Sequence, residues 1–196
     1  MGFSLSWAAV KGSTPAAVLE ELALRRTGTR EEIPESAITG AELPSGWYLV
    51  VSQRDCLEFT KDRVLEQLSR LGEVIMCFVE EHVMCSLAAC WRGGHRVWSV
   101  YHDSGGRSGS LHLDIKGEPP APFAEIRTRL TSEQEAAGGK KARVDMVFDV
   151  PVELARSVTG YRHDQDIPEL AKVAFEVLVS TQPPLKKSWF KKLLGP

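Results

Sequence analysis

The fold is decided between Gly46 and Asp103, where β-prone runs follow one another closely along the chain. These runs are GWYLVVS (Gly46–Ser52), CLEF (Cys56–Phe59), EVIMCFVEEHVMCSLAACW (Glu73–Trp91) and RVWSVYHD (Arg96–Asp103). They are rich in β-branched and aromatic residues, and short polar or glycine turns such as Gly93-Gly94 separate them. One helix-like segment, capped by Thr60 and stopped by Gly72, interrupts the series. We therefore expect a largely antiparallel sheet, continued by the alternating strand at residues 111–115.

The N-terminal segments add one strand and one helix to this sheet. FSLSWAAV (Phe3–Val10) alternates apolar and small polar residues, which predicts a half-buried strand. Thr14 followed by Pro15 is typical of a helix start, with the helix ending near residues 26–28. The next stretch, residues 27–44, is polar and contains two prolines, so it is predicted to be a long loop.

The C-terminal third predicts three helices and one late strand. A helix opens at Pro119–Pro122, a strand alternates over residues 144–148, and a short helix spans Pro151–Val158. A last helix is expected after Pro168, with an apolar face made by Leu170, Val173, Ala174, Val177 and Leu178.

Together these segments predict an α+β protein. The expected sheet is mixed but mainly antiparallel, has six to eight strands, and carries three or four helices packed on one side. We expect residues 1–182 to form a single domain and residues 183–196 to form a basic amphipathic tail.

The tail sequence KKSWFKKLLGP (Lys186–Pro196) differs from the rest of the chain. Its four lysines leave the body with a net charge of −2 − 4 = −6. Docking of the tail on its own body, or a disordered basic terminus, is favoured over two alternatives. These alternatives are an interfacial membrane helix and a helix that enters a partner's groove.

The composition excludes several classes of protein. With 196 residues, 43% hydrophobic and 26% charged, the chain resembles a water-soluble domain, and its net charge of −2 gives no reason to expect nucleic acid. We find no secretory signal and no apolar run of the ~20 residues that a membrane span needs, so we expect a cytoplasmic protein.

The four cysteines form no CxxC pair and are expected to be buried free thiols in a reducing compartment. No cofactor motif is present, and the oligomeric state is left open.

Three histidines on strand-like segments are candidate metal ligands. His82, His102 and His112 would share the open face of the sheet with nearby carboxylates, which could give a metal site or an acid–base pair. The alternative is that they are ordinary polar residues of a half-solvated sheet. The glycine-rich loop Gly105-Gly106-x-x-Gly109 has strands on both sides, so it does not predict a phosphate loop.

A dense polar cluster, Tyr161-Arg162-His163-Asp164 with Asp166, is the candidate site for a ligand or a partner. It lies in a loop, where binding residues are often found, and its arginine could bind an anion or a partner's carboxylate. The alternative is that its aspartates cap the helix expected after Pro168.

The segments GWYLVV, EEHVM and WSVYHD, together with the early FSLSWAAVKG unit, resemble a group of uncharacterised bacterial α+β proteins. The resemblance covers roughly residues 3–115 and implies no catalytic residue, because the group has no settled activity. We expect a non-enzymatic protein-binding module, because the small chain has no catalytic signature and its acidic body carries one exposed polar cluster. An immunity- or toxin-associated role is expected by analogy alone. The alternative is a small-ligand-binding protein or a metal-dependent enzyme that uses the sheet histidines or the Tyr161–Asp164 loop.

Overall fold

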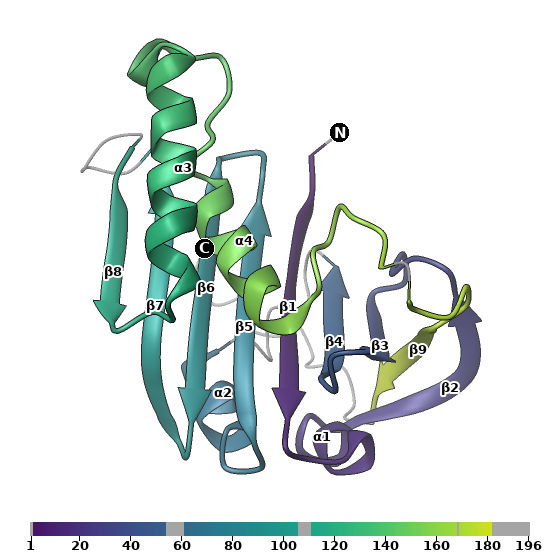
Figure 1. Cartoon of the computed structure of the whole chain (residues 1–196). Helices are drawn as coiled ribbons and strands as arrows, with labels where there is room; N and C mark the ends of the chain where they lie inside the picture. The colour runs from purple at the N-terminus through teal and green to yellow at the C-terminus, as the bar shows by residue number, and fades with distance from the viewer. Residues whose placement is uncertain (1, 54–60, 106–110, 168, 182–196) are drawn as a thin grey trace, which may run out of the picture.

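The computed structural model describes residues 2–53, 61–105, 111–167 and 169–181. Within them, nine strands form one sheet and four α-helices cover it (Figure 1). The strands are β1 (Ser4–Lys11), β2 (Leu24–Glu31), β3 (Ile38–Glu42), β4 (Tyr48–Gln53), β5 (Glu73–Glu80), β6 (Cys85–Arg92), β7 (His95–Asp103), β8 (Leu113–Gly117) and β9 (Phe175–Ser180). The helices are α1 (Pro15–Glu21), α2 (Asp62–Leu68), α3 (Pro122–Ala136) and α4 (Asp149–Thr159).

The sheet has the order β2-β9-β3-β4-β1-β5-β6-β7-β8, and the paired strands are antiparallel throughout. β1 is the central strand, and every residue from Leu5 to Val10 is buried. The sequence predicts a half-buried strand there, with Ser4 and Ser6 facing water. The structure buries Ser6 completely.

Side chains that alternate along β1 enter two separate cores. Trp7 and Ala9 belong to the core under α3 and α4, whereas Ala8 and Val10 belong to the core under α1 and α2. Figure 1 shows α3 and α4 in front of the β5–β8 half of the sheet, and no helix in front of β4, β3, β9 and β2. The segment between α4 and β9 passes over this second half.

The α+β class and the antiparallel sheet are confirmed, with nine strands among the described residues rather than six to eight. The four described helices match the expected number, but they are divided between the two faces rather than gathered on one. Thr14 caps α1 as predicted, its hydroxyl accepting from the Ala17 N–H at 3.3 Å. No described helix is long and apolar enough to cross a bilayer.

The prediction of a loop over residues 27–44 is wrong, because this stretch completes β2 and contains β3. α1 also ends earlier than expected, at Glu21, and Ala23 turns the chain with a φ of 51°. β2 has mostly exposed, polar side chains and therefore lacks the alternation that marks a strand in sequence. Its hydrogen bonds come from β9, about 150 residues later in the chain.

The prediction of a helix after Pro168 is also wrong, because residues 175–180 form β9 between β2 and β3. An apolar run of this length fits both the period of a helix and the period of a strand, and pairing with β2 and β3 decided the outcome.

The strand predicted over residues 144–148 is a turn that leads into α4. There, Asp145 Oδ1 accepts from the N–H groups of Val147 and Phe148, so these groups are not available to a sheet. The predicted Cys56–Phe59 strand and the tail lie outside the described residues.

Candidate functional site

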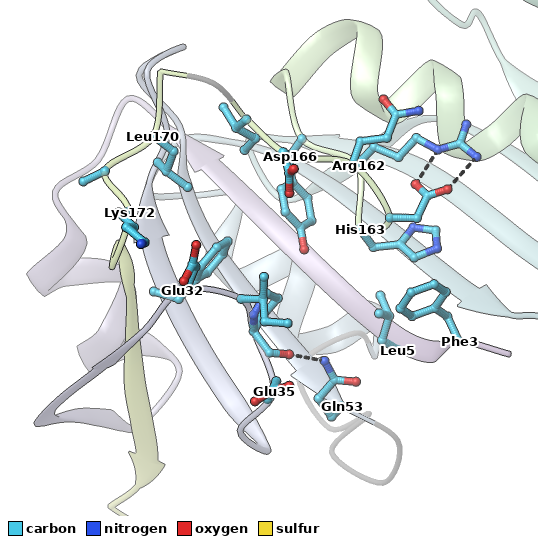
Figure 2. Close-up of a pocket in the computed structure, with 18 residues that line it drawn as sticks. Phe3, Leu5, Glu32, Glu35, Gln53, Arg162, His163, Asp166, Leu170 and Lys172 are labelled. Carbon is cyan, nitrogen blue, oxygen red and sulfur yellow. Dashed lines mark hydrogen bonds and ion pairs between the residues drawn. The ribbon is translucent and has the colours of Figure 1, made fainter. Parts of the chain in front are cut away.

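A cleft of about 770 Å³ lies over the uncovered half of the sheet (Figure 2). Two connections form its sides: residues 32–35 between β2 and β3, and residues 161–172 between α4 and β9, Pro168 aside. The lining is completed by Phe3, just before β1, Leu5 of β1, Gln53 at the end of β4 and Phe175 at the start of β9. This volume lies in the range of small-molecule and side-chain pockets.

The β2–β3 connection is held in place by one carboxylate and one amide. Glu31 Oε1 accepts from the N–H groups of Glu35 and Ser36 at 2.8 and 3.0 Å, which folds the connection into a tight turn. The Gln53 side chain donates to the carbonyl oxygen of Pro34, which ties the turn to β4. The side chains of Glu32, Ile33 and Glu35 are consequently displayed on a fixed backbone.

The α4–β9 connection begins where Gly160 ends α4 with a φ of 83°, in the left-handed region that glycine adopts without strain. The Ser45 hydroxyl donates to the carbonyl of Thr159, and the Tyr161 N–H donates to the Thr159 hydroxyl. These bonds turn the chain sharply, so that Tyr161 points back towards the sheet.

Tyr161 forms part of the floor of the cleft, and its ring contacts two other aromatic rings edge to face. Its ring centroid lies 5.3 Å from that of Trp7 and 6.4 Å from that of Phe175. The residue is 2% exposed, and its hydroxyl has no hydrogen-bond partner among the described residues. Burial raises the pKa of this hydroxyl, so it stays protonated and can accept or donate.

Arg162 contacts three carboxylates, two of them in α4 and the third, Asp164, in the connection itself. Its Nε lies 2.6 Å from Asp164 Oδ1, one Nη2 bond of 2.8 Å reaches Asp149, and Nη1 lies 3.7 Å from Glu153. Burial lowers the pKa of Arg162, but the bonds and charges of the aspartates more than offset this, so the pKa is raised. The guanidinium therefore bonds to carboxylates of its own chain, whereas the sequence leaves it able to bind an anion or a partner's carboxylate.

His163 is buried beside Phe3, with a ring centroid distance of 4.8 Å and a nearly perpendicular arrangement. Its side chain is 2% exposed, and Nε2 lies 3.8 Å from Glu81 Oε1, beyond hydrogen-bond distance. Neither ring nitrogen has a hydrogen-bond partner among the described residues. Burial lowers the pKa of His163, and Arg162 lowers it further, while Asp164 and Glu81 act in the opposite direction.

This lowered pKa predicts a loss of stability on acidification. Below the ordinary histidine pKa of about 6.5, His163 takes up a proton in the unfolded chain but stays neutral in the folded protein. The stabilising contribution is therefore complete above about pH 6.5 and declines as the pH falls towards the folded pKa. A His163→Asn variant should lose stability less steeply between pH 7 and 5.5 in urea titrations, by at most about 1.4 kcal/mol per pH unit.

The other four histidines remain in that variant, so the difference between the two slopes reports His163 alone. Equal slopes for wild type and His163→Asn would contradict the prediction.

Two of the three candidate metal ligands, His82 and His102, make other side-chain contacts. His82 lies in the exposed turn between β5 and β6, with Nδ1 2.7 Å from Glu80 Oε1. His102 is fully buried. Its Nδ1 donates to the carbonyl of His112 at 3.0 Å, and its Nε2 lies 2.9 Å from Asp145 Oδ2. No three His, Cys, Asp or Glu side chains gather as metal ligands in the part of the chain that the structure describes.

None of the described cysteines, Cys77, Cys85 and Cys90, lines the cleft. Cys77 and Cys90 are buried free thiols, and Cys85 is partly buried and also free, while Cys56 lies outside the described residues. Burial raises the pKa of Cys77, which keeps it a thiol rather than a thiolate.

The structure brings all four predicted residues, Tyr161 to Asp164, to the cleft. Sequence analysis missed the opposite side, including Ile33, because residues 27–44 are predicted to be a loop and no candidate residue was named in them. It also missed Phe3, which lies next to His163. One signal was available: Ile33 is an isolated apolar residue within the acidic run EEIPE. An apolar side chain in such a run has no core to join and is 53% exposed here.

No family model, no curated protein and no solved structure matches the chain.

Proposed function

We propose that the chain is a non-enzymatic protein-binding module and that the cleft is its recognition site. The observation that carries the proposal is the exposure of two large apolar residues at the cleft, Phe3 at 42% and Ile33 at 53%. Apolar side chains that surround a concave surface are typical of sites that anchor a partner. An immunity or toxin-associated role is one example of such a module, by analogy alone.

The construction of the cleft supports this proposal. Its apolar floor of Leu5, Tyr161 and Phe175 is fixed by β1, β9 and the ring contacts described above. Its sides are held by the Glu31 turn and by the Arg162 carboxylate bonds. A rigid site loses little conformational entropy when a partner binds, so a small contact area can still give specific binding.

A small-ligand-binding protein is the second candidate. The buried, unpartnered atoms of Tyr161 and His163 favour it, because a ligand could supply the hydrogen bonds that these groups lack. The metal-dependent reading has less support, since both ring nitrogens of His102 already have protein neighbours.

The test is affinity capture by the tagged full chain from its native lysate, with the captured proteins identified by mass spectrometry. Three baits are compared: wild type, Ile33→Asp at the cleft, and Val144→Asp as the matched control. Val144 is another exposed apolar residue, at 62%, and does not line the cleft. We expect one stoichiometric partner on wild type and on Val144→Asp, reduced at least tenfold on Ile33→Asp, because an aspartate would place a charge in the apolar contact.

Capture of the same proteins by all three baits would contradict the proposal, as would the absence of any stoichiometric partner. About one equivalent of a transition metal in the same preparation would favour the metal-dependent enzyme instead.

A further inference from the structure

The walls of the cleft carry more negative than positive charge. The ionisable side chains that line it, apart from His163, are the carboxylates of Glu32, Glu35, Asp164 and Asp166 and the cations of Arg162 and Lys172. The Arg162 guanidinium and the Asp164 carboxylate bond to each other through two contacts of 2.6 and 3.2 Å and cancel formally. Three carboxylates then face one ammonium group, which leaves a net formal charge of −2.

The remaining carboxylates are available to a ligand. Glu32, Glu35, Asp166 and Lys172 form no side-chain ion pair or hydrogen bond within the described part of the chain, and all four are exposed. Figure 2 places Glu32 and Lys172 across the cleft from Arg162 and His163, with Glu35 near Gln53. A positive charge that enters the cleft would therefore meet carboxylates on both connections.

The buried polar atoms of the cleft can accept hydrogen bonds from such a charge. The Tyr161 hydroxyl is without a partner among the described residues, and a neutral His163 has one ring nitrogen that accepts. His163 adds no positive charge near neutral pH, since burial lowers its pKa. Ammonium and guanidinium groups are donors only, so they complement these acceptors.

The floor of the cleft suits an apolar stem below that charge. Leu5, Ile33 and Leu170 give the cleft aliphatic surface on its floor and sides, while Phe3, Tyr161 and Phe175 give it aromatic rings. Cations are attracted to the faces of aromatic rings, and the methylene groups of arginine and lysine pack well on apolar surface.

We propose that the cleft binds an organic cation, a guanidinium or ammonium group on an apolar stem. Under the proposed function, on which this inference rests, the cation is an arginine or lysine side chain of the protein partner. A free alkylguanidine or alkylamine offers the same chemistry, and the experiment separates the two sources.

The experiment follows backbone amide shifts of the ¹⁵N-labelled full chain by NMR during titration with n-butylguanidinium. We expect shifts in residues 32–35 and 161–172, and no binding of n-pentanoate, which has a similar stem and the opposite charge. In Glu32→Gln/Glu35→Gln the dissociation constant should rise about fivefold, the effect of two partly exposed ion pairs. Glu20→Gln/Glu21→Gln makes the same change in net charge on exposed residues of α1 and should bind as wild type does.

A second variant, Tyr161→Phe, tests the buried acceptor. It removes an unpartnered hydroxyl and keeps the ring, so the fold should be at least as stable while the cation binds several-fold more weakly. The inference is overturned if n-pentanoate binds as tightly as n-butylguanidinium, or if the α1 control weakens binding as much as the cleft variant.

A peptide identifies the source of the cation. Acetyl-Ala-Leu-Arg-Leu-Ala-amide is compared with the same peptide that carries citrulline, which has the shape of arginine without its charge. Tighter binding of the arginine peptide than of n-butylguanidinium supports a partner's side chain, and equal binding supports a free cation. Should a captured partner depend on Ile33 while no cation binds, the inference falls and the proposed function stands.

Discussion

Replacement of Trp7 with alanine should lower the free energy of unfolding by about 3–5 kcal/mol, the largest effect expected of a single substitution here. Trp7 is fully buried in the centre of β1, between Val51 of β4 and Cys77 of β5. Alanine would leave a cavity beneath the Tyr161 ring, whose centroid lies 5.3 Å away. The loss should be measured by urea unfolding, and n-butylguanidinium binding should weaken because the floor of the cleft loses its support.

Two controls make this result specific. Trp7→Phe keeps an aromatic ring at the position and should cost only about 1–2 kcal/mol. Val83→Ala changes a residue that is 61% exposed and should stay within about 0.5 kcal/mol of wild type. A Trp7→Ala protein that unfolds within 1 kcal/mol of wild type would contradict the packing described for the centre of the sheet.

Replacement of Arg162 with methionine should lower the free energy of unfolding by about 1–3 kcal/mol. Methionine keeps the apolar stem but leaves Asp149 and Asp164 close together without their shared cation. The cost is smaller than for a fully buried pair, because each aspartate side chain is about one-third exposed and water screens its charge. Urea unfolding at pH 7 measures this loss.

Arg156→Met is the matched control for this variant. Arg156 is an exposed arginine of α4 that forms no side-chain ion pair with another described residue, so its loss should cost less than about 0.5 kcal/mol. Equal effects of the two substitutions would show that the carboxylate bonds of Arg162 do not stabilise the connection.

The pH dependence of the Arg162 effect has a defined sign for Asp164. Burial raises the pKa of Asp164, but the bonds and charge of Arg162 more than offset this, so the pKa is lowered. Its stabilising contribution is present above the ordinary aspartate pKa of about 3.9 and is lost as the pH falls through the folded value. The part of the Arg162→Met effect that comes from Asp164 should therefore persist from pH 7 to about pH 5.

The candidate site could be predicted only on one side. Tyr161 to Asp164 stand out in sequence because they are a dense polar cluster between apolar segments, and the structure places them at the cleft. Their individual chemistry could not be predicted. A sequence shows that Arg162 is present, but whether its guanidinium is free depends on Asp149, which lies one helix earlier in the chain.

The opposite side of the cleft could not be predicted, because its position depends on strand pairing over long range. β2 and β9 lie about 150 residues apart, and their pairing places Glu31 beside Phe175, at the edge of the cleft. Neither strand has a local pattern that excludes a loop or a helix.

Local patterns in the sequence were sufficient for the elements whose neighbours along the chain are also their neighbours in space. The meander from β5 to β7 and the start of α1 are of this kind, since each turn or cap lies within a few residues of what it joins. The tertiary structure alone decided the division of the helices between two faces, the strand identity of residues 175–180 and the formation of the cleft. The physical reason is that exposed strands and polar connections are stabilised by segments far away in the chain. The residues of such a strand or connection contain no pattern that identifies the segment with which it pairs.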